Sequence, residues 1–375
     1  MKVRTVVREI TATWKADELG PVKVVFLRPM PHMTAAVVVD NVALGPAIGG
    51  VRMTPTASVA EVARLARAMT LKNAAAGLPH GGGKSGVRRA ATMDGVSRDQ
   101  EMRAFARAIE QLTDYIPGPD MGTDEGCMAV VHDEIGRAVG LPSVLGGIPL
   151  DELGATGYGL ACCADALAAD KVIDLDGARA VVQGFGAVGS HAARALAGRG
   201  ARIIAVSDVQ GAVYREEGLD VEDLLAAKKA GRPVAGFPGG AAVERDEILW
   251  LECELLVPAA GPDVFTGENA GRVRAKTILQ GANIPATAAA ERIFHERHVL
   301  TVPDIVANAG GVICAAVEYQ GGTRAQAFAA IEEKIGANTA ELIDRLAASD
   351  ALPRQAATEM AMTRIRTATA YRRRF

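Results

Sequence analysis

Cysteine is scarce in this chain of 375 residues, and its cysteines follow no pattern typical of a metal site. None of the five belongs to a C-x-x-C motif: Cys127, Cys162, Cys163, Cys253 and Cys314. The six histidines are also dispersed, and only His295 and His298 lie within three positions of each other. A zinc site needs several such ligands at short, regular spacings. We therefore expect reduced thiols, mostly packed as small core side chains, and no bound metal.

Long hydrophobic runs and basic blocks are also missing. No segment approaches the ~18 apolar residues of a membrane span, and the N-terminal sequence lacks the apolar core of a signal peptide. The 41 basic and 44 acidic residues give a net charge of −3. This balance argues against nucleic acid or an anionic membrane as a partner. The sequence predicts a soluble, cytoplasmic protein.

The remaining composition is that of an ordinary globular protein, with 49% apolar and 23% charged residues. Domains usually hold about 100–200 residues, so a chain of this length favours two domains. Lysine is rare, because only 10 of the 41 basic residues are lysine and 31 are arginine. Lysine can lose its proton in a suitable environment, whereas arginine stays charged. Two lysines near glycine-rich segments are therefore candidate functional groups.

The first of these lysines, Lys72, lies on a predicted helix. Ser58 and Glu61 have the spacing of a capping box, in which both side chains bond backbone N–H groups at the helix start, and Gly77 supplies the stop. Apolar residues recur three or four positions apart on the stripe that includes Lys72. A buried lysine is costly unless it faces an anion, so we expect a cavity that holds one. The alternative is a lysine that extends to solvent from the helix end.

A glycine-rich segment, residues 81–86, carries the second lysine, Lys84. It is not a P-loop, because that motif needs a glycine where this chain has Leu78 and a strand where a helix is predicted. We interpret the consecutive glycines as the removal of side chains, which lets a small substrate and the Lys84 amine approach the backbone. Two ammonium groups around one pocket would lower the pKa of at least one, and a neutral lysine is a competent general base.

Two further elements are candidates for the same site. Gly49 and Gly50, just before an arginine, could offer backbone N–H groups to a carboxylate, although segment 45–52 alone fits a turn between strands. Asp120 follows a proline-rich segment and precedes a helix expected to begin near Thr123. It is either a carboxylate that stabilises the helix start or a proton-transfer group beside Lys84.

A G-x-G-x-x-G motif lies between an apolar strand and a helix. It comprises Gly184, Phe185, Gly186, Ala187, Val188 and Gly189. The next strand ends at Asp208, 24 positions after the first glycine, close to the ~20 expected for the carboxylate that binds ribose hydroxyls. The motif predicts a dinucleotide whose pyrophosphate binds the helix start. No arginine directly follows Asp208, which favours NAD without excluding NADP.

The rest of the chain continues the alternation of strands and helices, so the predicted fold class is α/β. Two short apolar strands end near Ala259 and Asn283, and ligand groups in open parallel sheets lie at such ends. We assign Ala259 to the cofactor, and Asn283 to the nicotinamide end. From Thr323 onward the sequence predicts two alanine-rich helices.

Six segments, in order, closely resemble the glutamate/leucine/phenylalanine/valine dehydrogenases: MTLKNAAAGLPHGGGKSG, GPDMGT, ATGYG, QGFGAVG, QGAN and ANAGGV. The resemblance covers about residues 45–318. It implies a substrate and oligomerisation domain (1–145), a Rossmann-like NAD-binding domain (146–324) across a cleft, and C-terminal helices (about 325–375) that pack back on the first. It also implies a homo-oligomer that reversibly deaminates an L-amino acid to a 2-oxo acid and ammonium with NAD.

The same resemblance implies roles for individual residues. Lys84 matches the catalytic lysine of the family, and Asp120 matches its proton-shuttling carboxylate. Lys72, with the backbone of Gly49 and Gly50, matches the site of the substrate α-carboxylate. Asn283 matches a residue near the nicotinamide and the substrate.

Substrate specificity departs from the glutamate branch of this family. Glutamate-specific members carry a lysine where this chain has Ile48, and a serine where it has Ala315. Neither side chain can satisfy the second carboxylate of glutamate, and an unpaired buried charge costs several kcal/mol. We therefore expect a branched-chain or aromatic substrate. The alternatives are a glutamate dehydrogenase, which the segments around Thr156 and Asp208 resemble more, and a catalytically silent subunit of a mixed oligomer.

Overall fold

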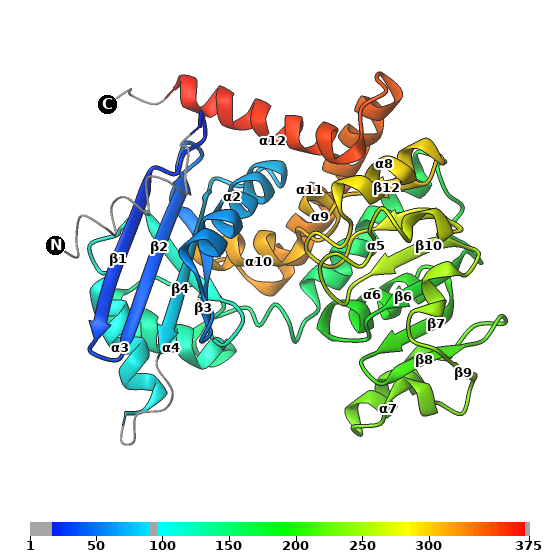
Figure 1. The fold of residues 1–375 in the computed structure, drawn as a ribbon, viewed down its shortest axis with the longest axis horizontal. Coiled ribbons are helices and arrows are strands. Elements are labelled where there is room, and N and C mark those ends of the chain that lie inside the picture. Colours follow the sequence, from blue (N-terminus) through cyan, green and yellow to red (C-terminus); the bar gives the residue numbers. More distant parts are fainter. Residues whose placement is uncertain (1–16, 90–95, 372–375) are drawn as a thin grey trace. The chain divides into compact units, whose positions relative to one another are not determined.

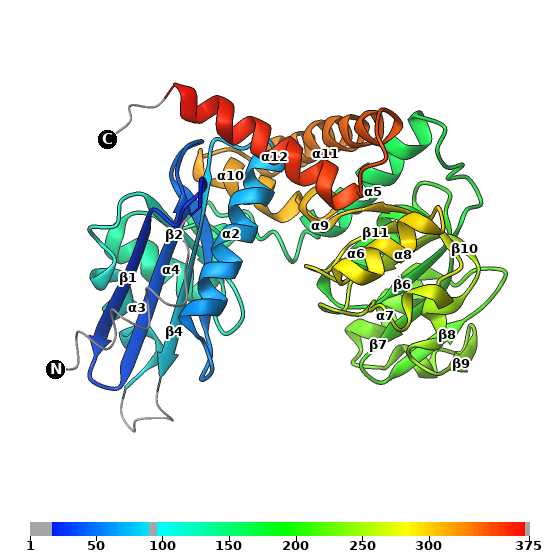
Figure 2. The ribbon, with the colours of Figure 1, turned by 45° about the horizontal axis from the view of Figure 1, so that its top comes forward.

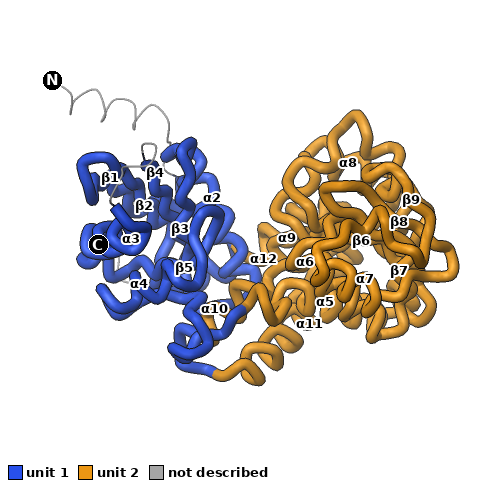
Figure 3. The backbone as a smooth tube through the Cα atoms, turned by 90° about the horizontal axis from the view of Figure 1, so that it is seen from below, with its two compact units in different colours: residues 1–149, 318–322, 362–375 blue, residues 150–317, 323–361 orange. Residues whose placement is uncertain are grey.

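The computed structural model describes residues 17–89 and 96–371, and the chain divides into two compact units (Figure 3). Unit 1 comprises residues 1–149, 318–322 and 362–375, and unit 2 comprises residues 150–317 and 323–361. Each unit is built around a sheet of its own (Figure 1), which confirms the predicted α/β class. Within the described ranges, no helix is both long and apolar enough for a bilayer crossing.

The described part of unit 1 contains a five-stranded mixed sheet in the order β1-β2-β4-β3-β5. Its strands are β1 (Lys23–Met30), β2 (Met33–Asn41), β3 (Ala47–Met53), β4 (Gly81–Arg89) and β5 (Tyr115–Pro119). β2 pairs antiparallel with β1 and β4, whereas β3 runs parallel to β4 and β5. The three inner strands, β2, β4 and β3, are therefore flanked on both sides.

Helices cover both faces of this sheet (Figure 3). They are α2 (Val59–Ala75) on one face, and α3 (Arg98–Ala108) and α4 (Glu125–Ile135) on the other. Val38 of β2 packs in one apolar cluster with Val62 of α2. The adjacent Val37 packs in another with Phe105 of α3 and Met128 of α4. Successive side chains of a strand point to opposite faces, so β2 supplies both cores.

The two glycine-rich segments of unit 1 are strands inside the sheet, which corrects the predicted turn at residues 45–52. The pair at Gly49 belongs to β3 rather than to a turn, and the run at 81–83 belongs to β4. A methyl group on Gly82 would lie 2.0 Å from the backbone nitrogen of Thr70, and one on Gly49 only 1.6 Å from the Gly83 oxygen. The missing side chains therefore make room for α2 and the neighbouring strand, and the approach of a substrate to these glycines stays a prediction. The glycine pattern alone does not distinguish the two causes.

α2 begins where the sequence predicts, but its capping box is used differently. The Ser58 hydroxyl accepts a hydrogen bond from the Glu61 backbone N–H at 3.2 Å, as expected. The Glu61 carboxylate instead accepts from Arg52 Nη1 on β3 at 2.6 Å. Glu61 therefore forms a long-range ion pair with Arg52, whereas the local pattern predicted that its side chain would cap the helix start.

Unit 2 contains, among its described residues, a seven-stranded sheet in the order β12-β11-β10-β6-β7-β8-β9. Its strands are β6 (Arg179–Gln183), β7 (Arg202–Asp208), β8 (Gly211–Tyr214), β9 (Ala241–Val243), β10 (Cys253–Pro258), β11 (Ala275–Leu279) and β12 (Leu300–Val302). The strands from β12 to β7 run parallel, and β8 and β9 add antiparallel strands at the edge. The chain crosses to opposite sides of β6 to form β7 and β10. In open α/β sheets such a point, at the carboxyl ends of the strands, is where ligands bind.

Helices surround this second sheet (Figure 2). They are α5 (Ala155–Ala169), α6 (Ala187–Ala197), α7 (Val221–Lys229), α8 (Ala288–Glu296), α9 (Asp304–Ala307) and α11 (Arg324–Ala347). Two further helices, α10 (Gly310–Tyr319) and α12 (Pro353–Ala370), begin in unit 2 and end in unit 1. α6 joins β6 to β7, and α5 packs against α6 and α11. α11 and α12 are the predicted C-terminal pair, which confirms that part of the sequence reading.

The packing of the glycine strand gives a stability prediction. Gly82→Ala is expected to lower the free energy of unfolding by about 2–3 kcal/mol, because backbone atoms of Thr70 occupy the place of the new methyl group. Gly336→Ala is the matched control: it lies inside α11 with no neighbouring atom within 4 Å of the added carbon. Alanine should there raise stability by about 0.5–1 kcal/mol. Urea unfolding measures both, and equal stabilities would contradict the packing argument.

Candidate active site

Lys84 lies on the face of the unit 1 sheet that α2 covers. Because side chains alternate along β4, Lys84 shares its face with Gly82 and Gly86, whose added methyl groups would meet Thr70 and Val62 of α2. The strand therefore presents one long cationic side chain between two positions without side chains.

Two groups of the predicted site approach the Lys84 amine closely. A methyl group on Gly50 of β3 would lie 3.0 Å from Lys84 Nζ and 2.7 Å from Asp120 Cβ. Lys84 Nζ is 2.9 Å from Asp120 Oδ2, and the lysine side chain is only 9% exposed. The structure thus brings together Lys84, Asp120 and the paired glycines.

Burial lowers the pKa of Lys84 below its ordinary value, and the nearby Arg52 guanidinium adds to this lowering, whereas Asp120 opposes it. The direction is the one expected from the sequence, but the leading cause is burial, where the sequence argument invoked a second lysine. Such an amine is easier to deprotonate than an exposed lysine.

Arg52 is the charged residue of this cluster that the sequence reading left without a role. Its Nε donates to Asp120 Oδ2 at 3.0 Å, and its Nη1 donates to Glu61 Oε1. Two cations, Arg52 and Lys84, therefore converge on one carboxylate oxygen. Burial acts to raise the pKa of Asp120, but the two cations outweigh it and hold that pKa below its usual range. Arg52 lies two positions after Gly50, so recognising the segment as a strand would have placed both on one face.

Asp120 does not cap the following helix. Asp124 is the N-cap residue of α4, and its carboxylate accepts from the Cys127 backbone N–H at 2.9 Å. The Asp120 backbone N–H donates to the Thr123 hydroxyl at 3.0 Å, while its carboxylate faces Lys84. Of the two interpretations open in the sequence, the geometry favours the group beside Lys84.

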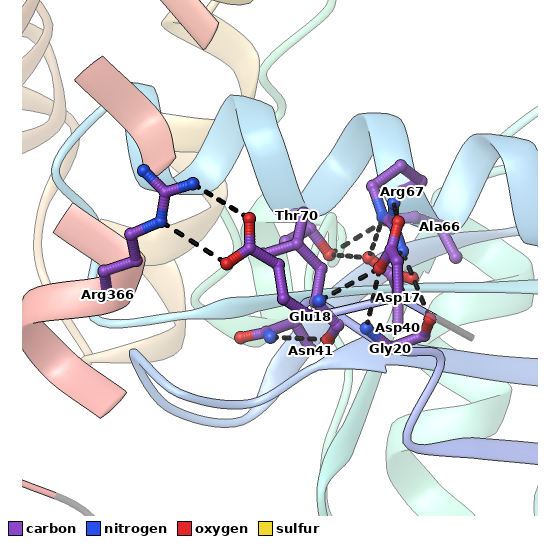
Figure 4. Close-up of polar contacts among 10 residues, drawn as sticks. Asp17, Glu18, Gly20, Asp40, Asn41, Ala66, Arg67, Thr70 and Arg366 are labelled. Atoms are coloured by element: carbon purple, nitrogen blue, oxygen red, sulfur yellow. Dashed lines mark hydrogen bonds and ion pairs between the residues drawn. The ribbon is translucent and has the colours of Figure 1, made fainter. Parts of the chain in front are cut away.

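Lys72 lies in the last turn of α2 and is 9% exposed, as the helical stripe predicts. A polar network fixes this helix on the sheet (Figure 4). Asp40, at the end of β2, accepts from the Thr70 hydroxyl at 2.6 Å and from Arg67 Nε at 2.8 Å. Arg67 also donates to both carboxylate oxygens of Asp17. These bonds set the position of the helix that carries Lys72.

Tyr115 of β5 braces the paired glycines and was missed in the sequence. Its hydroxyl donates to the Gly49 carbonyl at 2.8 Å and lies 2.9 Å from the Ser85 hydroxyl. Burial raises the pKa of Tyr115, so the phenol stays neutral. Ile48 precedes these glycines, is 4% exposed, and shares the face of Gly50 because the two are separated by two positions on β3.

In unit 2 the glycine motif joins β6 to α6. Gly184 has φ of 89°, and a methyl group there would lie 2.8 Å from the backbone of Ala260. A methyl group on Gly189 would lie 1.9 Å from the Gly184 oxygen. Gly186 is the N-cap of α6, makes no side-chain cap, and has open space around its Cβ position. The free start of α6 fits the pyrophosphate of a dinucleotide.

The other expected cofactor residues gather at the same edge of the sheet. The loop residue Phe185 donates its N–H to the Ser207 carbonyl at 2.7 Å, and Ala187 and Val188 form the first turn of α6. Asp208 ends β7, with its carboxylate held by the backbone N–H groups of Gln210 and Val234. Ala259 follows β10 and donates to the Gln183 carbonyl at 2.8 Å. The glycine-rich loop, the Asp208 carboxylate and the small residue Ala259 therefore lie at one edge of the sheet, which is the arrangement that a nucleotide site requires.

Asn283 and Ala315 also belong to unit 2, whereas Lys72, Lys84 and Asp120 belong to unit 1. Asn283 lies in the loop after β11, and its side-chain oxygen accepts from Asn308 Nδ2 at 3.2 Å. Ala315 lies in α10 and is 6% exposed.

No metal centre is evident within the described ranges, which hold no group of three or more histidine, cysteine, aspartate or glutamate side chains suited to an ion. All five cysteines are buried, as expected for small core side chains, and none of them forms a disulfide.

The charge cluster predicts opposite effects of two substitutions on the pKa of Lys84. Arg52→Gln should raise it, because a neighbouring cation is lost and Asp120 is left to the lysine. Glu61→Gln should lower it, because a neighbouring anion is lost. The pH dependence of acylation at Lys84, followed by mass spectrometry of its peptide, measures both. Shifts of the same sign would contradict this account.

Two family models match the chain. The Glu/Leu/Phe/Val dehydrogenase dimerisation domain matches residues 29–137, and the Glutamate/Leucine/Phenylalanine/Valine dehydrogenase model matches residues 146–373. The glutamate dehydrogenase of Aeropyrum pernix is 41% identical over 326 residues, which cover 81% of this chain and 77% of that protein. The NADP-specific glutamate dehydrogenase of Saccharolobus shibatae is 39% identical over 298 residues, 74% of this chain and 69% of that one.

A solved structure agrees with these matches. The hetero-hexameric glutamate dehydrogenase from Thermus thermophilus, in its Leu-bound form, superposes with a TM-score of 0.82 at 28% identity, covering 99% of this chain and 97% of that chain. The family expected from the motifs is thereby confirmed: the chain belongs to the glutamate/leucine/phenylalanine/valine dehydrogenases, a family of amino acid dehydrogenases.

Proposed function

We propose that this chain catalyses the reversible, NAD(P)-dependent oxidative deamination of an L-amino acid, with L-glutamate as its preferred substrate. The observation that carries the reaction is the buried Lys84 amine, which shares one oxygen of Asp120 with Arg52. Glutamate is favoured because the curated relatives at about 40% identity are named glutamate dehydrogenases. These relatives do not support the branched-chain or aromatic substrate that the sequence led us to expect.

The reaction consumes an amino acid, water and the oxidised cofactor, and yields a 2-oxo acid, ammonium, the reduced cofactor and a proton. A bound nicotinamide would supply the acceptor for the hydride of Cα, and loss of this hydride would leave the substrate as an iminium. The neutral Lys84 amine then takes a proton from water as the oxygen attacks that carbon. Protonated Lys84 returns this proton through Asp120 to the departing nitrogen. The C–N bond then breaks, and the hydroxyl proton passes to the released ammonia as the C=O bond forms, which gives ammonium.

Lys72 has a different task from Lys84. A charged ammonium on a buried helix face is stabilised by an anion, and the substrate α-carboxylate supplies one. Gly50 lies on the same sheet face as Lys84, and the proposal gives its backbone N–H group and that of the adjacent Gly49 to the same carboxylate. Holding the substrate in this way places its Cα for reaction.

The nucleotide site of the proposal lies at the switch point of the unit 2 sheet. The start of α6 would hold the pyrophosphate, Asp208 the adenosine ribose, and Asn283 the nicotinamide end. Asp208 favours NAD, while one relative is named NADP-specific, so activity should be assayed with both cofactors.

The proposal also assigns a role to each domain predicted from the sequence. Residues 1–145 would bind the substrate and form the oligomer, and residues 146–324 would bind the cofactor. A homo-oligomer is part of the same proposal.

A second candidate is activity on aliphatic or aromatic amino acids. The buried Ile48 and Ala315 favour it, because neither can neutralise the second carboxylate of glutamate. A silent subunit of a mixed oligomer is disfavoured, since the cluster of Lys84, Asp120 and Arg52 is complete.

Lys84→Ala should lower kcat by about 10²–10⁴, the usual contribution of a general base, while NADH binding persists. The reason is that the glycine motif of unit 2 is untouched. Lys276→Ala is the control, because that lysine is 71% exposed on β11. Near-normal turnover of the Lys84 variant would remove this lysine from the mechanism.

A substrate panel tests the choice of amino acid. The purified chain should show a higher kcat/KM for L-glutamate than for leucine, valine or phenylalanine, assayed with NAD and with NADP. The reverse order would establish the second candidate. Absence of turnover with all twenty L-amino acids would favour the silent subunit.

A further inference from the structure

Arg354, the second residue of α12, binds three separate partners in unit 2. Its Nε donates to Glu291 Oε1 of α8 at 2.6 Å, and its Nη1 to Asp304 Oδ1 of α9 at 2.8 Å. Its Nη2 donates to Gln280 Oε1, just after β11, at 2.7 Å. All three nitrogens of one guanidinium are therefore used, and the helix start lies close to α8 and α9 (Figures 1 and 2).

The partners of Arg354 are deeply buried. The side chains of Glu291 and Asp304 are 7% and 4% exposed, and Gln280 is fully buried. Burial acts to lower the pKa of Arg354, but the two carboxylates outweigh it and raise that pKa above its usual value. A planar guanidinium can hold three acceptors at fixed angles, whereas a lysine ammonium on the same stem cannot.

Two of these partners also hold the loop that carries Asn283. The second oxygen of Asp304, Oδ2, accepts from the Ile284 backbone N–H at 2.9 Å. Gln280 begins the loop, and its Oε1 also accepts from the Asp304 backbone N–H at 3.1 Å. The loop 280–284 is therefore tied at both ends to groups that Arg354 binds.

The end of this loop needs such a hold. Ile284 has φ of 49°, in the left-handed region that β-branched side chains disfavour, and it directly follows Asn283. Relaxation of Ile284 would rotate the backbone on which the asparagine side chain is mounted. The Asn283 carboxamide already has a partner in Asn308, which also donates to the Gly281 carbonyl within the same loop.

We propose that Arg354 is a positioning residue, which fixes the Asn283 carboxamide for hydride transfer by holding Asp304 and Gln280 at the two ends of its loop. The inference rests on the proposed function, because it takes Asn283 to contact the nicotinamide and the substrate. Buried ion pairs contribute less stability than well-packed apolar groups, so a cluster of this kind is better suited to fixing a geometry.

The test compares Arg354→Lys with wild type in the full-length protein. We expect kcat to fall by about tenfold or more, because small misplacements at a reacting centre cost up to about 10²-fold. The deuterium isotope effect on kcat with 2-deuterated L-amino acid should rise, because hydride transfer becomes more rate-limiting. The acidic limb of the pH profile, set by Lys84, should stay in place.

Two further sets of variants separate positioning from folding. Arg345→Lys is the matched control on α11, where the arginine pairs with Glu341 near the surface, and its kinetics should match wild type. Ile284→Gly leaves the charges intact and should repeat the isotope effect of Arg354→Lys. Ile284→Asn should retain more activity than Ile284→Gly, because asparagine tolerates the left-handed conformation and leaves the backbone less freedom than glycine does.

The outcomes are distinct. Normal kcat and isotope effect in folded Arg354→Lys would overturn the inference, and so would a loss of active protein with unchanged kinetics per active site. If Arg354→Lys does not fold, Ile284→Gly and Ile284→Asn provide the test. Isotope effects equal to that of wild type in both variants would overturn the inference. An inactive wild-type chain would instead overturn the proposed function itself.

Discussion

The rest of unit 1 depends on one constraint. A buried lysine amine, that of Lys84, contacts a carboxylate that also binds an arginine. Taking the Lys84 ammonium out of water disfavours its charge, and Asp120 opposes this effect. Arg52 binds the same Asp120 oxygen, so the negative charge of this carboxylate is shared between the arginine and the lysine. The result is an anion beside an amine that is ready to accept a proton.

The sheet and its covering helix make this arrangement possible. Period-two alternation places Lys84, Gly50 and Arg52 on one face of adjacent strands, and glycines on either side of the lysine let α2 pack against that face. The network around Asp40 and Arg67 then fixes α2 (Figure 4). The sheet thus serves as a support for charges, while the nucleotide site that we propose for unit 2 lies at the carboxyl ends of its strands.

The sequence predicts elements whose signals are local and fails where distant contacts decide. The helix with Lys72, the strand–glycine–helix unit ending at Asp208 and the C-terminal helices have clear periodicity or caps. The segments around Gly49 and Gly82 show no apolar alternation, so the sequence does not reveal that they are strands. Pairings such as Glu61 with Arg52, or Arg354 with its three partners, join segments far apart in the chain, so no local pattern reveals them.

The most direct test of this account is a titration of Lys84 in the folded protein. Lysine labelled with ¹³C at Cε gives at most ten side-chain signals from this chain, and a Lys84→Arg variant identifies the one that matters. The account predicts that this signal titrates below 10.5, the ordinary lysine value. A pKa at or above that value would contradict the claim that the buried cluster holds a proton-accepting amine.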